Sequence, residues 1–134
     1  MNDDAPYFDL PDIAPEAPGR FVTIDTDLPT LGLLNGLVLR PLVGRDVLVS
    51  FARYEPHCEV PMHAHEEEQV LIVVEGELEL EMEGAKRTMR PGDVAHLPAF
   101  VPHATRTLDG PAYQIDVFTP PRKPMVELLA EQAG

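Results

Sequence analysis

Side chains that commonly bind transition metals lie in two short stretches of this sequence. His63 and His65 are separated by one residue, Gln69 follows after three more, and His103 lies on a later segment. In an extended strand, side chains at even spacing point to the same side, so the first three can face one pocket. Three imidazoles and one amide oxygen form a site for one divalent transition metal (Zn, Ni, Mn, Fe or Cu), with positions left for solvent or substrate.

The acidic run between these residues offers other ligands. Glu66, Glu67 and Glu68 stand directly before Gln69. We predict that this run is solvated and that strand alternation turns Glu68 away from the pocket. A strand shifted by one residue would instead bring Glu68 in, and this alternative stays open.

Composition limits the classes of partner. A chain of 134 residues with 44% hydrophobic residues suits one globular domain, and its formal net charge of -13 argues against nucleic acid and anionic membrane surfaces. Cys58 is the single cysteine, which excludes an intrachain disulfide and fits a reducing compartment. No signal peptide and no apolar run of membrane-spanning length is visible. We therefore expect a cytoplasmic protein.

The hydrophobic pattern indicates an all-β domain of short strands. Fifteen prolines and nine glycines mark frequent turns, and residues 77–83 alternate glutamate with apolar residues, as a half-buried strand does. Strands are also predicted at 21–26, 37–42, 47–54, 70–74, 94–97 and 113–118, and a turn-rich connection at 27–36. The pattern predicts an acidic, proline-rich arm at 1–20, mobile or packed on a partner, a closed barrel at 21–124, and a tail at 125–134 with a short helical turn.

Two anchored motifs resemble the cupin superfamily. His63, His65, Gln69 and Gly76 match the spacing of its first motif, while Gly92, Pro98 and His103 match the second. Four positions depart from the usual residues: His57 and Phe100 replace glycines, Gln69 replaces an acidic ligand, and Thr107 replaces an asparagine. The resemblance implies a double-stranded β-helix, the jelly-roll barrel, with the metal site inside one end, and a homodimer.

A narrower resemblance concerns the last strand. The Glu68-Gln69 pair and residues 116–122 are similar to small cupins of pectin degradation, which linearise unsaturated uronates. That resemblance implies that Asp116 and Arg122 are catalytic, with Asp116 moving a proton and Arg122 binding a substrate carboxylate. Phe118 and Gln114 share the face of Asp116 and are predicted to contact substrate, as is Met62 at the pocket mouth.

Other candidate residues are assigned structural places. We expect His57 at the surface or rim, His96 half-buried by packing, Cys58 buried, and Phe100 as an apolar wall at the pocket mouth.

Three functions fit these residues. The first is a metal-dependent enzyme, of isomerase or lyase type, that acts on a small polar substrate such as an unsaturated uronate or sugar acid in carbohydrate metabolism. The second is a cupin dioxygenase that uses a redox metal. The third is a non-enzymatic module that binds a small molecule.

Overall fold

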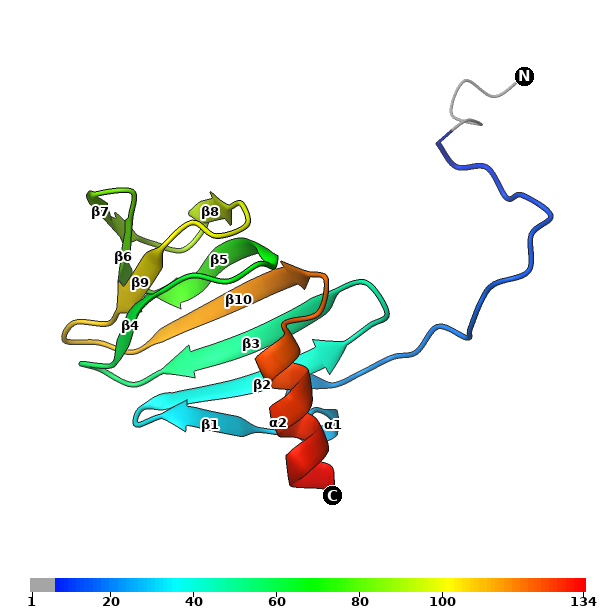
Figure 1. Ribbon diagram of the computed structural model, residues 1–134, viewed down its shortest axis with the longest axis horizontal. Coiled ribbons are helices and arrows are strands. Elements are labelled where there is room, and N and C mark those ends of the chain that lie inside the picture. The colour runs from blue at the N-terminus through cyan, green and yellow to red at the C-terminus, as the bar shows by residue number, and fades with distance from the viewer. Residues whose placement is uncertain (1–6) are drawn as a thin grey trace.

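Two antiparallel β-sheets face each other and form a barrel in the computed structural model, which describes residues 7–134 (Figure 1). The larger sheet has the order β1-β2-β3-β10-β5-β8. Its strands are β1 (Leu31–Leu34), β2 (Leu37–Val43), β3 (Leu48–Tyr54), β5 (Glu68–Gly76), β8 (Val94–Leu97) and β10 (Ala112–Thr119). The smaller sheet has the order β4-β9-β6-β7 and comprises β4 (Glu59–His63), β6 (Leu78–Met82), β7 (Ala85–Met89) and β9 (His103–Arg106). The predicted all-β jelly roll is confirmed.

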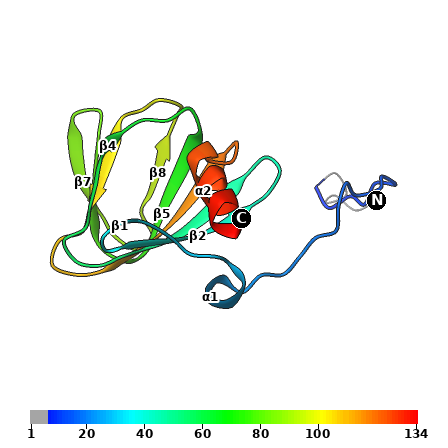
Figure 2. The same ribbon diagram turned by 60° about the horizontal axis from the view of Figure 1, so that its bottom comes forward.

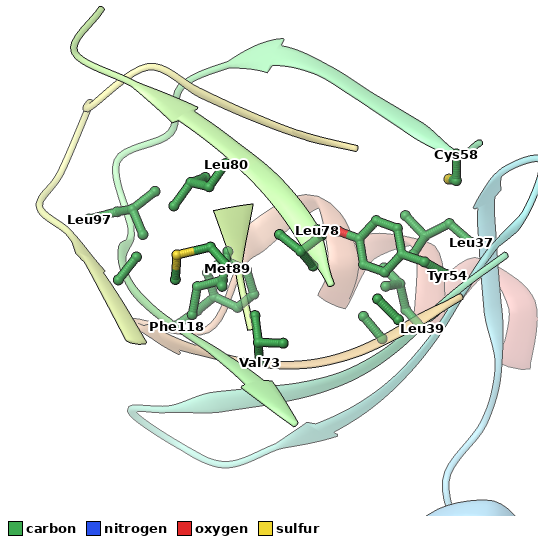
Figure 3. Packing of buried hydrophobic residues seen from close by; sticks show 14 of the residues in the cluster. Leu37, Leu39, Tyr54, Cys58, Val73, Leu78, Leu80, Met89, Leu97 and Phe118 are labelled. Carbon is green, nitrogen blue, oxygen red and sulfur yellow. The ribbon is translucent and has the colours of Figure 1, made fainter. Parts of the chain in front are cut away.

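Apolar side chains from both sheets fill the barrel (Figure 3). On β6, Leu78 and Leu80 are buried, whereas Glu79 and Glu81 alternate with them and are partly exposed, as the sequence pattern predicted. Each leucine buried in this way contributes about 1.5–3 kcal/mol. Burial of one face of each strand therefore fixes how the strands pair, since a shift by one residue would expose these leucines. The same pairing positions the polar residues at one end of the barrel.

The single cysteine lies at the edge of this core. Cys58 is 3% exposed, as predicted, and burial raises the pKa of its thiol, with the carboxylates of Glu55 and Glu59 raising it further. Because the thiolate is the reactive form, we expect iodoacetamide at pH 8 to modify the native protein at least roughly tenfold more slowly than the urea-unfolded chain. Mass spectrometry over a time course measures both rates, and equal rates would contradict the burial.

The N-terminal segment differs from its prediction in one respect. Residues 7–20 are exposed, contain no helix or strand and extend away from the barrel, while residues 1–6 of the predicted arm lie outside the described part (Figures 1 and 2). The predicted strand at 21–26 is wrong, because Ile24–Asp27 forms a one-turn helix, α1. The Asp27 side chain accepts a hydrogen bond from the Thr23 N–H at 2.7 Å, which closes this turn locally.

Two further elements were missed or shortened. The predicted connection at 27–36 contains strand β1, whose Leu31 pairs with Leu39 of β2. The C-terminal helix α2 spans Lys123–Ala133, so it begins before the predicted tail and is longer than the predicted short helical turn. Pro124 lies in its first turn, where proline is tolerated because that N–H has no helical partner. Within residues 7–134, no helix has the length and apolar character needed to cross a bilayer.

The turn between β6 and β7 provides a test of the backbone. Glu83 and Gly84 both have positive φ, 52° and 77°, and Met82 pairs with Ala85 across them. Such two-residue turns strongly favour Asn-Gly, and glutamate is poorly suited to the first position. We expect Glu83→Asn to raise the free energy of unfolding by about 0.5–1 kcal/mol in urea titrations. Glu83→Gln, which removes the same charge without suiting the turn, should show little of this gain; an equal gain would assign the effect to charge.

Candidate metal centre

Three histidines converge at one end of the barrel. His63 is the last residue of β4, His103 is the first residue of β9, and the two pair directly across the smaller sheet. His65 lies in the connection that leads from β4 to β5 in the larger sheet. One ligand nitrogen from each ring lies within 4.8 Å of the others. The prediction that His63 and His65 share a strand is wrong, because the chain changes sheets between them, yet both rings still reach the same place.

Each imidazole has one nitrogen fixed by a backbone carbonyl. A carbonyl can only accept a hydrogen bond, so each Nδ1 carries the proton and each Nε2 keeps a lone pair for a metal. The pairs are His63 Nδ1 with Pro61 O at 2.8 Å, His65 Nδ1 with Glu67 O at 2.9 Å, and His103 Nδ1 with Val101 O at 2.9 Å. Burial lowers the pKa of His65 and lowers that of His103 to about 4, which keeps these two rings neutral near pH 7.

Gln69 supplies an oxygen beside these rings. Its Nε2 donates to Asp116 Oδ1 at 2.8 Å, so its Oε1 is the atom that lies 3.0 Å from His65 Nε2. With the His65 proton on Nδ1, two lone pairs would face each other across this distance. A cation bound by both atoms resolves the repulsion. The residues therefore fit a metal ion held by His63, His65, His103 and Gln69.

A buried carboxylate stands behind Gln69. Asp116 is 6% exposed, and its oxygens also accept hydrogen bonds from Gln114 Nε2, each at 2.8 Å. Burial raises the pKa of Asp116 to about 6, although the hydrogen bonds from Gln114 and Gln69 oppose this shift. The structure thus places Asp116 and Gln114 beside the predicted ligand Gln69, on the inner face of the larger sheet.

The acidic run contains a residue that sequence reasoning misplaced. Glu67 is 2% exposed, and its carboxylate accepts hydrogen bonds from Arg122 Nη1 and from the Lys123 N–H, both at 3.2 Å. Burial raises the pKa of Glu67, but these hydrogen bonds and the Arg122 charge outweigh it and lower the pKa overall. The prediction of a solvated run is wrong for Glu67 and holds for Glu66 and Glu68, which are exposed. In the structure, burial alternates along this stretch, so that residues 65, 67 and 69 are buried while residues 66 and 68 are exposed.

The remaining predicted residues fall into two groups. Phe118 is 5% exposed, and its ring meets that of His65 edge-on with centroids 5.7 Å apart. Met62 is 49% exposed and borders a groove with Glu79 and Glu81, on the outer face of the smaller sheet. The structure therefore places Phe118 beside the histidines and Met62 away from them.

The two other histidines lie outside the centre. His57 is exposed near Asp109, as predicted. His96 is exposed and its Nε2 bonds Glu68 Oε2, so the prediction that it is half-buried by packing is wrong. Strand alternation explains this, since Ala95 and Leu97 take the inward positions on β8.

Two of the four departures from the motif share a backbone feature. His57 and Phe100 occupy the usual glycine positions and both have positive φ, 58° and 67°. Glycine adopts this conformation without steric cost, whereas other residues do so at some expense in free energy. Phe100 is 67% exposed, and its N–H donates to His65 O at 2.8 Å, which fixes the loop beside His65. Both sites thus keep the motif's backbone shape despite the change of residue.

Comparison with known proteins identifies the family. The model of the cupin domain matches residues 50–118, which include all four candidate ligands and span about half of the chain. This chain is a cupin. Among solved structures, KdgF from Halomonas sp. superposes with a TM-score of 0.70 at 27% identity, over 76% of this chain and 96% of that one. An RmlC-like cupin from Shewanella frigidimarina shares the fold at 23% identity, with a TM-score of 0.73 over 80% of this chain and 96% of that one.

A curated relative matches part of the cupin. Dimethylsulfoniopropionate lyase DddQ from Ruegeria pomeroyi is 40% identical over 68 residues, which cover 49% of this chain and 34% of the lyase. The match thus spans about a third of that enzyme's length. These likenesses agree with the cupin barrel that the two sheets form.

Proposed function

We propose that this cupin is a metal-dependent enzyme that acts on a small carboxylate substrate, such as an unsaturated uronate or a related sugar acid. The observation that carries the proposal is the convergence of three imidazole Nε2 atoms and the Gln69 oxygen beside the buried Asp116. The likeness to KdgF over most of both chains supports the sugar-acid class. A bound divalent ion would polarise a carbonyl or ring oxygen of the substrate.

Asp116 is the candidate for proton transfer. A carboxyl group with a pKa near 6 exchanges protons readily at neutral pH, because both of its protonation states are populated there. Its face of β10 is shared with Gln114 and Phe118, as the pairing of the strand with β3 and β5 requires. Asp116 would therefore hold or release a proton on the inner wall, beside the ligand Gln69.

Arg122 is the candidate for binding the substrate carboxylate. Its Nη1 is held by Glu67 at 3.2 Å, and 23% of its side chain is exposed. A guanidinium has five N–H donors in one plane, so the bond to Glu67 leaves donors free for a bidentate contact. Phe118 would offer an apolar surface next to His65.

The test is turnover by protein loaded with single metals. Unsaturated galacturonate, measured by loss of its ultraviolet absorbance, should be consumed by the wild type and not by Asp116→Asn. Turnover by no metal-loaded form would contradict the uronate assignment.

A second candidate is cleavage of dimethylsulfoniopropionate, favoured by the 40% identity to the lyase over half of this chain. Release of dimethyl sulfide by the metal-loaded protein would support this second function. Oxygen consumption would select the dioxygenase alternative, and a thermal shift with ligand but no turnover would select a binding module.

We infer from the composition that the protein is cytoplasmic, and from its likeness to small cupins that it forms a homodimer. Light scattering during gel filtration measures the mass, and a monomer at micromolar concentration would contradict the dimer.

A further inference from the structure

The metal centre has an unusual distribution of charge. The cupin motif places an acidic residue at the position of Gln69, but here the ligand is neutral and a carboxylate, Asp116, lies 2.8 Å behind its amide nitrogen. A carboxamide has one acceptor and one donor end, and rotation by 180° exchanges them. The orientation of Gln69 therefore decides whether the centre contains an oxygen ligand or an N–H group.

The alternative orientation of Gln69 would oppose metal binding. With its amide rotated, Nε2–H would lie near His65 Nε2 and donate to the lone pair that a metal needs. His65 offers that lone pair because Glu67 O holds its proton on Nδ1 at 2.9 Å. The rotated amide would also turn Oε1 toward Asp116, and two acceptors would meet at about the distance of a hydrogen bond.

We propose that Asp116 is a positioning residue for the metal centre: by accepting the Gln69 N–H, it directs the amide oxygen toward the three imidazoles. This inference rests on the metal site of the proposed function and adds a role for Asp116 that is independent of proton transfer. Gln114 completes the arrangement, since its Nε2 contacts both oxygens of Asp116 at 2.8 Å and holds the carboxylate in place.

Gln69 and Asp116 are complementary, because one provides a hydrogen-bond donor and the other accepts it. Gln69→Glu alone would bring two carboxylates together in a buried place, where one must take up a proton or move away. When Asp116→Asn is added to Gln69→Glu, the new amide can donate to the new carboxylate. When Asp116→Asn is the only change, its side chain can turn the amide oxygen forward and accept from Gln69. The effect of Asp116→Asn on metal affinity should therefore depend on the residue at position 69.

The experiment measures Zn²⁺ affinity by competition with a chelating indicator. We expect Asp116→Ala to weaken binding about 10–100-fold, as loss of a partner behind a metal ligand does. Asp116→Asn alone should stay within about 3-fold of wild type, whereas the double variant should bind at least roughly tenfold more tightly than Gln69→Glu alone. Ser50→Ala is the matched control: Ser50 is fully buried, pairs with Asp116 across β3 and β10, and its Oγ has no partner within the described residues.

Several outcomes would overturn the proposal. Unchanged Zn²⁺ affinity in Asp116→Ala, or the same effect of Asp116→Asn with and without Gln69→Glu, would do so. If Asp116→Ala lost turnover but kept wild-type Zn²⁺ affinity, Asp116 would act in proton transfer alone and the proposed function would stand. If Asp116→Ala did not fold, the comparison of wild type, Gln69→Glu, Asp116→Asn and the double variant still decides the question. Failure of the wild type to bind Zn²⁺ would overturn both proposals.

Discussion

Replacing His63 with alanine should remove most of the bound metal from the purified protein. His63 contributes one of three Nε2 lone pairs, and its Nδ1 is already committed to Pro61 O at 2.8 Å. The two remaining imidazoles and the amide oxygen are neutral, so no ligand charge compensates for the loss. We expect the affinity to fall by more than the roughly 10–100-fold that follows loss of an outer partner.

Elemental analysis measures this effect in protein purified without added metal or chelator. Wild type should contain close to one equivalent of a transition metal, and His63→Ala a small fraction of it. His96→Ala is the matched control, because that exposed histidine bonds Glu68 and lies outside the centre. Since His63 is itself half-buried, the variant should remain folded. Equal metal content in His63→Ala and wild type would contradict the assignment.

Replacing Glu67 with alanine should produce the largest loss of stability among the glutamates of the acidic run. Its carboxylate is fully enclosed and binds both Arg122 and the Lys123 N–H at the start of α2. Removing one partner of a buried ion pair typically costs about 3–5 kcal/mol. Because 23% of the Arg122 side chain is exposed and water can reach it, we expect about 2–4 kcal/mol.

Urea unfolding of the metal-free protein provides the measurement. The neighbouring Glu66→Ala is the control, since Glu66 is exposed and should change the free energy of unfolding by no more than about 0.5 kcal/mol. Glu67→Gln keeps an acceptor oxygen and the shape of the side chain but removes the charge. Its loss in free energy of unfolding should therefore lie between those of Glu67→Ala and Glu66→Ala. Equal stability of Glu67→Ala and Glu66→Ala would show that the ion pair contributes nothing.

The sequence predicted those parts of the fold whose periodicity is strong. The alternation of leucine and glutamate on β6 and the apolar run on β5 indicated strands, and a domain with many such strands closes into a barrel. The spacing of His63, His65 and His103 indicated the metal centre, even though His65 lies between strands. The spacing was enough to predict that these histidines lie close together, because the motif identifies the residues that converge even where one of them lies outside a strand.

Other features depended on contacts between distant segments. Glu67 is buried because Arg122 and Lys123 reach it from the far end of the chain, and no local pattern of charge shows this. The α1 turn is a local exception. The Asp27 side chain accepts a hydrogen bond from the Thr23 N–H, and this bond favours a turn where the alternation of apolar residues at 21–26 favours a strand. The Gln69 amide donates to Asp116 because the pairing of β5 with β10 brings the two residues together.

The source of the imidazole orientations has an evolutionary consequence. Each Nδ1 binds the carbonyl of a residue only two positions away along the chain. In all three rings, a backbone carbonyl close in sequence holds the proton on Nδ1. This arrangement does not depend on the side chains of the surrounding cavity wall. Selection can therefore exchange wall residues such as Phe118 while the three rings keep their orientation, and a single scaffold can in this way accommodate different ligands.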